Sequence, residues 1–366
     1  MPIGEKENHQ NKFLIQLNQD LHSTAIYSVF MVIIADFFTA ISGLASVMLI
    51  LNLELNSMKA LVTGGAGFIG SHLVRFLLHN GVDVKVYDSF SSGSLKNLVS
   101  VESEVEVIKS DVRNFDALVA AMEGVGLVFH IAAFVSVSES VNNPRLTYEV
   151  NAEGTLNTLS AALLSGVSRV VISSSCAVYG DRHEPPLKET DLPMPRSPYA
   201  ASKLTAEAWA ESFYQSYGLE TVCLRYFNVY GPGQKSDSDY AAVIPKFLNC
   251  YNWKQRPKVY GDGLQTRDFI YVEDVAWANF LAATASSEIM ANHRIFNVGT
   301  GKGLNLLKLL EAIATEMGDK IQPEFHPPRV GDIRHSWANT SLVKNELGFE
   351  PKINIDLGIK KLLSKD

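Results

Sequence analysis

The sequence has little cysteine, no excess of positive charge and no repeated segments. Its three cysteines (Cys176, Cys223 and Cys250) are scattered and odd in number, so they fit neither a disulfide framework nor a zinc-binding spacing. This pattern favours a reducing, cytoplasmic compartment and predicts no metal site. The net charge of −7 leaves no basic stripe to neutralise phosphates, which argues against nucleic-acid binding.

What is present is ordinary for a globular protein. The chain has 366 residues, of which 46% are hydrophobic and 19% are charged. A chain of this length can bury a substantial core and suggests one large domain or two modest ones.

Residues 1–57 form an extension with a composition of its own. Within it, residues 26–51 are apolar almost throughout, with Asp36 as the only charge. A helix of this length would rise about 39 Å, enough to cross a hydrocarbon core of about 30 Å. Two interpretations remain open: a membrane anchor, or a misassigned start with Met58 as the true first residue. Membrane contact is expected only in the first case.

The stretch from Lys59 to Leu78 predicts a strand, a glycine turn and a helix without a gap. Lys59–Thr63 is a short apolar run, and three glycines follow it at Gly64, Gly67 and Gly70. Such a turn lets backbone N–H groups approach a pyrophosphate at the helix N-terminus. The first gap is one residue longer than in the usual G-x-G-x-x-G. A tight turn without a ligand is the alternative.

The second predicted strand, Val82–Tyr87, ends at Asp88, about twenty residues beyond the glycines. An acidic residue in this position accepts hydrogen bonds from a free ribose 2′-OH and repels a 2′-phosphate. No arginine follows Asp88 closely, so the pattern favours NAD over NADP.

Further strands are predicted to alternate with helices, which indicates an α/β fold with a doubly wound parallel sheet. Asp111 follows the third strand and could contact the adenine or cap a helix from Phe115. His130 ends the fourth strand and is interpreted as a packed histidine rather than a catalyst. The remaining predicted elements are strands at 105–109, 127–130, 169–173 and 221–225, and a long helix at 146–164.

Three polar side chains form the predicted catalytic group. Tyr199 and Lys203 are four residues apart and share a helix face, and Ser175 ends a neighbouring strand. A tyrosine has a pKa of about 10, too high for a base at neutral pH. A nearby lysine ammonium and a positive nicotinamide ring would both favour the phenolate.

With these motifs in place, the chain resembles the extended short-chain dehydrogenase/reductase family. Thr63–Gly70, Ser173–Gly180 and Tyr199–Lys203 carry the resemblance, which is greatest to the NAD-dependent epimerases and dehydratases, in particular the UDP-glucose (UDP-N-acetylglucosamine) 4-epimerases. It runs from Met58 to about Leu363. It implies a Rossmann domain over 58–227 and a smaller α/β substrate-binding lobe over 228–366, some of which returns to the Rossmann domain.

The resemblance also implies roles for individual residues. Tyr199 would be the acid/base, Lys203 would bind the nicotinamide ribose and tune Tyr199, and Ser175 would orient the sugar 4-OH. The implied NAD contacts are Gly64, Gly67, Phe68, Ile69, Gly70, Asp88, Asp111, Val112, Ala132, Asn151, Tyr199 and Lys203.

For the substrate, the resemblance implies diphosphate contacts and a uridine pocket. Ser336 stands where epimerases limited to plain hexoses carry a bulky tyrosine, so a small residue there leaves room for a 2-N-acetyl group. The implied substrate contacts are Ser175, Asn228 and Arg267 at the sugar and diphosphate, Val243 and Ile244 at the uracil, Arg329 and Asp332 at the phosphate and ribose, and Ser336.

The activity expected is NAD-dependent 4-epimerisation of a UDP-hexose through a 4-keto sugar. Dehydratases of the group carry an Asp-Glu pair where this chain has Cys176 and Ala177, so elimination would lose its acid and base. UDP-glucuronate 4-epimerase, a 4,6-dehydratase with displaced acid and base, and a non-catalytic sensor of NAD or nucleotide sugars remain alternatives. A homodimer is expected to pair the helices at 146–164 and 199–217. The glycines at 299–303 are read as an ordinary turn.

Overall fold

The computed structural model describes residues 58–181, 183–235, 243–319, 321–328 and 333–364. Residues 58–366 form one compact unit. No helix of these described ranges is long and apolar enough to cross a membrane. The apolar segment 26–51 lies outside the described residues, so both interpretations of it stay predictions.

A parallel sheet of seven strands forms the centre of this unit, in the order β11-β6-β5-β4-β1-β2-β3. The chain first moves outward from β1 to β3 and then returns to β4 on the other side of β1. The predicted doubly wound sheet is therefore confirmed, and its switch point lies between β1 and β4. The strands are β1 Lys59–Thr63, β2 Asp83–Asp88, β3 Glu106–Lys109, β4 Leu127–His130, β5 Arg169–Ser175, β6 Glu220–Tyr226 and β11 Ile295–Val298.

Helices flank this sheet in two groups. Helix α2 (Phe68–His79) packs against α9 (Val272–Thr284), whereas α6 (Gly154–Leu164) packs between α3 (Phe115–Ala121) and α7 (Pro198–Tyr217). The crossover from β1 to β2 and the crossover from β4 to β5 run in opposite directions along the sheet. Because both are right-handed, they place α2 and α6 on opposite faces. Under α3, α6 and α7 lies a continuous apolar core that includes Leu118, Leu159 and Phe213.

The helix expected at 146–164 is interrupted. Helix α5 covers Pro144–Thr147, a π-helical turn covers Tyr148–Glu153, and only then does α6 begin. The π-helical turn adds only a single residue to the helix, so the periodicity of apolar residues does not reveal it. π-Helical turns occur frequently at functional sites, and this one carries Asn151.

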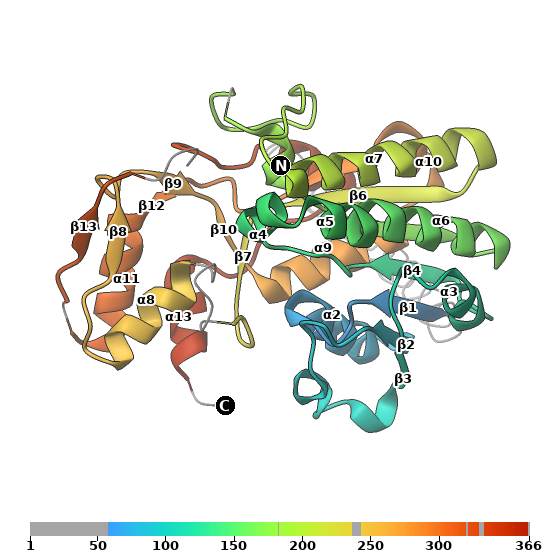
Figure 1. Cartoon of the computed structure of the whole chain (residues 1–366), viewed down its shortest axis with the longest axis horizontal. Coiled ribbons are helices and arrows are strands. Elements are labelled where there is room, and N and C mark those ends of the chain that lie inside the picture. Colours follow the sequence, from blue (N-terminus) through green and yellow to red (C-terminus); the bar gives the residue numbers. More distant parts are fainter. Residues whose placement is uncertain (1–57, 182, 236–242, 320, 329–332, 365–366) are drawn as a thin grey trace, which may run out of the picture. The chain divides into compact units, whose positions relative to one another are not determined.

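Elements from the second half of the chain form a smaller group beside the sheet (Figure 1). It includes the strand pairs β8–β13, β9–β12 and β7–β10 and has an apolar core of its own, to which Phe247, Leu310 and Ile359 contribute. Because β11 joins the large sheet, part of this half returns to it; the boundary at residue 228 stays a prediction. The elements are β7 Asn228–Tyr230, β8 Lys258–Tyr260, β9 Thr266–Arg267, β10 Phe269–Tyr271, β12 Leu304–Asn305, β13 Glu324–His326, α8 Val243–Asn252, α11 Leu306–Met317 and α13 Ile355–Leu363.

Short helices complete the described chain. They are α4 Val137–Asn142, α10 Ser287–Asn292, α12 Ser341–Leu347, and the 3₁₀ turns Leu95–Leu98, Glu102–Glu104 and Cys176–Tyr179.

Candidate functional site

The glycine turn between β1 and α2 leaves no room for side chains. Gly64 has a φ of +69°, and a Cβ on it would lie 2.7 Å from the backbone nitrogen of Ala132. A Cβ on Gly70 would lie 2.1 Å from the carbonyl oxygen of Gly64, so the helix can lie this close to the turn only because residue 70 is glycine. Helix α2 starts after Gly67, with Phe68 and Ile69 as its first residues, and no side chain caps it. The turn therefore has the geometry of a phosphate cradle.

Asp88 ties the end of β2 to this turn. Its carboxylate accepts hydrogen bonds from the N–H groups of Ala66 (2.9 Å) and Phe90 (2.7 Å). The carbonyl of Ala66 in turn accepts the side-chain amide of Asn97 at 2.8 Å. The loop after β2 is thus anchored to the glycine turn. No pattern in the sequence indicates this role of Asn97. A carboxylate accepts about four hydrogen bonds, so Asp88 keeps capacity for ribose hydroxyls.

Asp111 pairs with its neighbour Arg113. Two guanidinium hydrogen bonds of 2.9 Å join the side chains, and they hold the pKa of Asp111 below its ordinary value. Asn114, not Asp111, caps α3, because its side chain accepts the N–H of Ala117 at 3.2 Å. The capping alternative for Asp111 is wrong, and its contact with adenine stays a prediction. Val112 is buried beside α6.

Asn151 links the segment after β4 to α7. Its amide bonds both backbone groups of Phe134, at 2.7 and 3.1 Å, and donates to the hydroxyl of Ser202 at 2.9 Å. Ser202 donates to the carbonyl of Tyr199 at 2.8 Å. All these contacts are internal, so the structure gives Asn151 a positioning role; a direct NAD contact stays a prediction.

His130 packs among hydroxyl groups. Its Nδ1 lies 2.9 Å from Thr63 Oγ1, and its Nε2 lies 3.1 Å from Thr155 Oγ1. Burial lowers the pKa of His130 to about 3, so the ring is neutral. The interpretation of a packed histidine fits this arrangement. Thr63 Oγ1 also accepts the N–H of Ala132 at 3.3 Å and so places the residue opposite Gly64.

The predicted catalytic side chains meet where β5 ends and α7 begins. The hydroxyl of Ser197 accepts the N–H of Ala200 at 3.1 Å and caps α7, so that Tyr199 stands in its first turn. The side chain of Ser175, the last residue of β5, acts on the pKa of Tyr199 as a hydrogen-bond partner of its hydroxyl. Lys203, one turn further, donates to Ser173.

Burial dominates the protonation of this group. It raises the pKa of Tyr199 to about 12, and the hydrogen bond with Ser175 only partly opposes this. Burial also lowers the pKa of Lys203 to about 8. The Lys203 ammonium lies 2.8 Å from the carbonyl oxygen of Ser173. With a pKa of about 12, Tyr199 is protonated at neutral pH. The tuning of Tyr199 by Lys203, which the resemblance implies, stays a prediction.

Cys176 connects the catalytic group to the second half of the chain. The side chain of Ser336 and the charge of Arg267 both lower the pKa of its thiol. Burial raises the pKa of Cys176 to about 11, so the thiol is neutral at neutral pH. The structure thus brings Ser336 and Arg267, far away in sequence, next to Ser175.

Asp268 organises the loops around this point, which the sequence did not indicate. Its fully buried carboxylate accepts the N–H groups of Thr300 (2.7 Å), Gly301 (2.9 Å) and Ala338 (3.1 Å). These bonds occupy N–H donors of the 299–303 loop, as expected for an ordinary turn. Helix α11 then begins at Leu306.

The remaining substrate-contact predictions fare differently. Asn228 has a buried Oδ1 without a hydrogen-bond partner among the described residues, as expected for a polar atom at a ligand site. Ile244 is 1% exposed and packs in the core of the smaller group, and its contact with uracil stays a prediction. Val243 packs partly against the same core. Arg329 and Asp332 lie outside the described residues.

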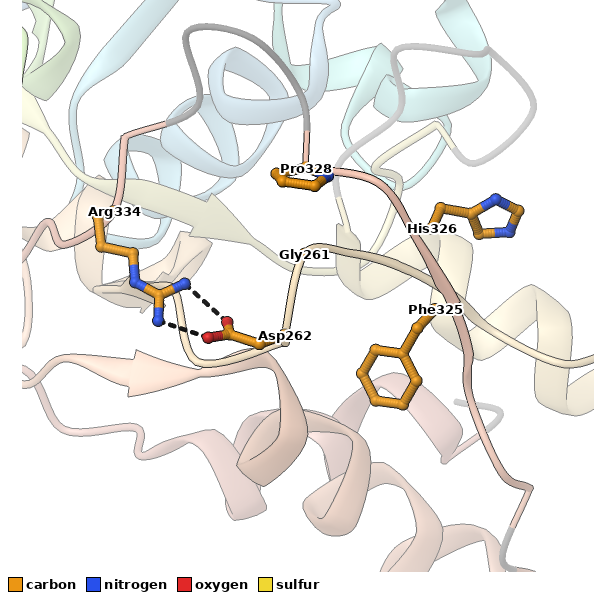
Figure 2. Close-up of a pocket in the computed structure, with 6 residues that line it drawn as sticks. All are labelled: Gly261, Asp262, Phe325, His326, Pro328 and Arg334. Atoms are coloured by element: carbon orange, nitrogen blue, oxygen red, sulfur yellow. Dashed lines mark hydrogen bonds and ion pairs between the residues drawn. The ribbon is translucent and has the colours of Figure 1, made fainter.

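An open cavity lies in the smaller group, lined by Gly261, Asp262, Phe325, His326, Pro328 and Arg334 (Figure 2). Asp262 and Arg334 face each other across its edge and form two hydrogen bonds of 2.7 Å. From Arg334 the chain runs beside β9 to Ser336, whose N–H donates to the carbonyl of Thr266 at 3.2 Å. The chain therefore leads from this cavity to Ser336, beside Cys176, within two residues.

Comparisons with known proteins agree with this geometry. The model of the "NAD dependent epimerase/dehydratase family" matches residues 60–299. A UDP-glucose 4-epimerase of Mycolicibacterium smegmatis is 39% identical over 310 residues, which cover 83% of this chain and 97% of that protein.

Solved structures are similar over the same range. A UDP-N-acetylglucosamine 4-epimerase from Methanobrevibacter ruminantium, in complex with UDP-N-acetylmuramic acid, is 38% identical with a TM-score of 0.78 and covers 84% of this chain and 99% of its own. A Thermus thermophilus UDP-glucose 4-epimerase in complex with NAD is 36% identical with a TM-score of 0.76, and the match covers 84% of this chain and 100% of that one. The chain therefore belongs to the NAD-dependent epimerase/dehydratase family, and it is an enzyme of the isomerase class that uses NAD.

Proposed function

We propose that the protein inverts C4 of a UDP-hexose by a redox-neutral epimerisation. The observation that carries this proposal is the contact of Tyr199 with Ser175 at the carboxyl end of β5. Both belong to the sheet edge that also carries the glycine turn and Asp88, where a dinucleotide binds in doubly wound folds. Relatives that match this chain over nearly their whole length bear the names of UDP-sugar 4-epimerases.

The residues present fit NAD. The side-chain-free turn at Gly64, Gly67 and Gly70 would receive the pyrophosphate, and Asp88 the adenosine ribose. When bound, NAD would supply the hydride acceptor and donor for C4, and its positive ring would favour the phenolate of Tyr199. Lys203 would hold the nicotinamide ribose.

The protein's own side chains would move the proton. Tyr199 removes the proton from the 4-OH when the 4-keto sugar forms and gives it back when the hydroxyl is restored. Ser175 shares that oxygen through its hydroxyl and keeps it within reach of the phenol. Arg267 and Asn228 would hold the diphosphate, so that the sugar alone can turn between the two hydride transfers.

Elimination is disfavoured because the neighbouring side chains are not acids or bases. The Cys176 thiol is neutral at neutral pH, and Ala177 carries no ionisable group. A 4,6-dehydratase would need both an acid and a base near C5 and C6.

Incubation with UDP-glucose, UDP-GlcNAc and UDP-glucuronate, followed by proton NMR of the sugar, tests the proposal. We expect the galacto epimers of the first two to accumulate without added NAD. Epimerisation of UDP-glucuronate alone would replace the proposal with that activity. A 4-keto-6-deoxy product would identify a dehydratase, and no turnover of any UDP-sugar would favour a sensor.

We further propose that Ser336 sets the breadth of the substrate. Ser336 is 5% exposed and touches the Cys176 thiol, so it lies within one residue of the catalytic serine. A larger side chain there would fill the space left for a 2-N-acetyl group.

Ser336→Tyr should therefore reduce kcat/KM for UDP-GlcNAc by about a hundredfold, whereas UDP-glucose should lose less than about tenfold. Steady-state kinetics on both substrates measures this, with Ser341→Tyr at the start of α12 as a control substitution. Equal loss on both substrates contradicts the assignment.

A further inference from the structure

Helix α7 carries a third polar residue on the face that holds the catalytic pair. Tyr199, Lys203 and Glu207 are spaced four residues apart and so lie on one side of the helix. Each is hydrogen-bonded to one of three consecutive serines at the end of β5. The pairs are Tyr199 with Ser175, Lys203 with Ser173, and Glu207 with Ser174.

Glu207 is buried in an ion pair. It is 4% exposed, and its Oε1 accepts the hydroxyl of Ser174 at 2.5 Å. Arg225 from β6 is 2% exposed and donates two hydrogen bonds to the same carboxylate, at 2.8 and 2.7 Å. The carboxylate therefore joins α7 to both neighbouring strands.

Stability is a weak explanation for this pair. Replacing a buried ion pair by well-packed apolar residues is often neutral or stabilising, because desolvation of the two charges offsets their attraction. A buried pair is better explained by what it fixes in place. Here it lies one helical turn beyond Lys203, whose ammonium is also buried.

We propose that Glu207 is a positioning residue of the active site, which fixes α7 on β5 and holds a negative charge one turn from the Lys203 ammonium. This inference rests on the proposed function, because it serves the role given to Lys203 there. The Glu207 charge raises the pKa of Lys203 and so opposes the effect of burial. It keeps the lysine charged, and able to donate, over a wider pH range.

Other ionisable groups also surround this point. The Lys203 ammonium acts on the buried ring of His130 in β4, and Glu207 also acts on the thiol of Cys223 in β6. Among the described residues, the ionisable groups that face Lys203 and Glu207 are Tyr199, His130, Cys223, Arg225, Glu211, and, beyond Arg225, Tyr179 and Glu189.

Two variants test the proposal. Glu207→Gln removes the charge but keeps a side-chain oxygen that can accept the hydroxyl of Ser174. The single variant leaves the Arg225 charge unpaired in the core and could fail to fold for that reason. The double variant Glu207→Gln/Arg225→Met removes this charge as well. The control is Glu211→Gln, one turn further along α7. It removes the half-exposed carboxylate that pairs with Arg294 at 2.7 Å and leaves the contact of Glu207 with Ser174 in place.

The readout is the titration of Lys203 itself, followed by NMR of protein with ¹³C-labelled lysine and assigned with Lys203→Met. We expect its midpoint to fall by about one pH unit in both Glu207 variants and to stay in place in the control. The alkaline limb of the kcat profile on a UDP-sugar should move with it. A purely structural role predicts lower thermal stability with an unchanged midpoint, and this result in either variant overturns the proposal.

The parent protein is assayed first, which separates two kinds of failure. Absence of epimerase activity in the parent would contradict the proposed function. An active parent with an unmoved Lys203 midpoint in the variants would contradict only the role of Glu207.

Discussion

At the scale of single residues, the catalytic group is set by burial more than by charge. Tyr199 keeps its proton because its phenol is removed from water, and Ser175 is its hydrogen-bond partner. The phenol is therefore in position before substrate arrives, but it needs an additional positive charge to act as a base at neutral pH. This makes Tyr199 the residue whose loss should affect chemistry most and folding least.

Tyr199→Phe should lower kcat on the UDP-sugar substrate by about a hundredfold to ten-thousandfold, because the proton carrier is removed and the ring remains. NMR of the sugar products gives the rate, and absorbance of denatured protein gives the NAD content, which should be unchanged. Tyr148→Phe, the same substitution at a 55% exposed tyrosine, serves as the control. Turnover at the parent rate would remove Tyr199 from the mechanism.

The residue-level predictions from sequence succeeded where a pattern reports a backbone requirement. Gly64 and Gly70 are needed because backbone atoms approach within contact distance, and that is visible as glycine after a strand. The roles of Asn97, Asp268 and Glu207 depend on partners about 30 or more residues away. No local spacing reports such contacts, so these residues were missed.

At the scale of elements, the turn between β1 and α2 is the least tolerant part of the candidate site. Its glycines bring the helix against the strand, and the uncapped N-terminus of α2 then points its N–H groups at the same place. The strands themselves were predictable because parallel strands buried on both faces are short apolar runs. The strands of the smaller group were less predictable, because strands of two or three residues are too short to show an alternation of apolar and polar residues.

Gly70→Ala should prevent this approach, because the new methyl group would meet the Gly64 carbonyl oxygen at 2.1 Å. We expect a loss of about 2–4 kcal/mol in unfolding free energy and a large fall in bound NAD. Urea unfolding and NAD content per chain measure both effects. Gly126→Ala is the matched control, since a Cβ there has its nearest neighbour at 4.0 Å; equal behaviour of the two variants would contradict the tight-approach argument.

At the scale of the whole molecule, apolar side chains remain exposed on the helices expected to form a dimer. They lie at the ends of the segments 146–164 and 199–217, with Tyr148 55%, Leu164 69% and Tyr217 60% exposed. Exposed apolar side chains on neighbouring helices fit a surface that another protein covers. A second copy of the chain remains our prediction for that partner.

Light scattering of the purified protein should give the mass of a dimer, and Leu164→Glu should shift it toward the monomer by placing a charge in the interface. Leu192→Glu, at a 71% exposed leucine outside these helices, should leave the mass unchanged. A monomeric parent protein, or a dimer that tolerates Leu164→Glu as well as Leu192→Glu, would contradict this interface.

The π-helical turn at Tyr148–Glu153 has a consequence for how this chain can change. One surplus residue in that turn sets the angular offset between α5 and α6, and Asn151 reaches both Phe134 and Ser202 from within it. Deleting a residue between Asn151 and α6 would restore an ordinary helix and rotate Asn151 by about 100° relative to α6. The length of this segment is thus as constrained as its composition, although nothing in its hydrophobicity marks it.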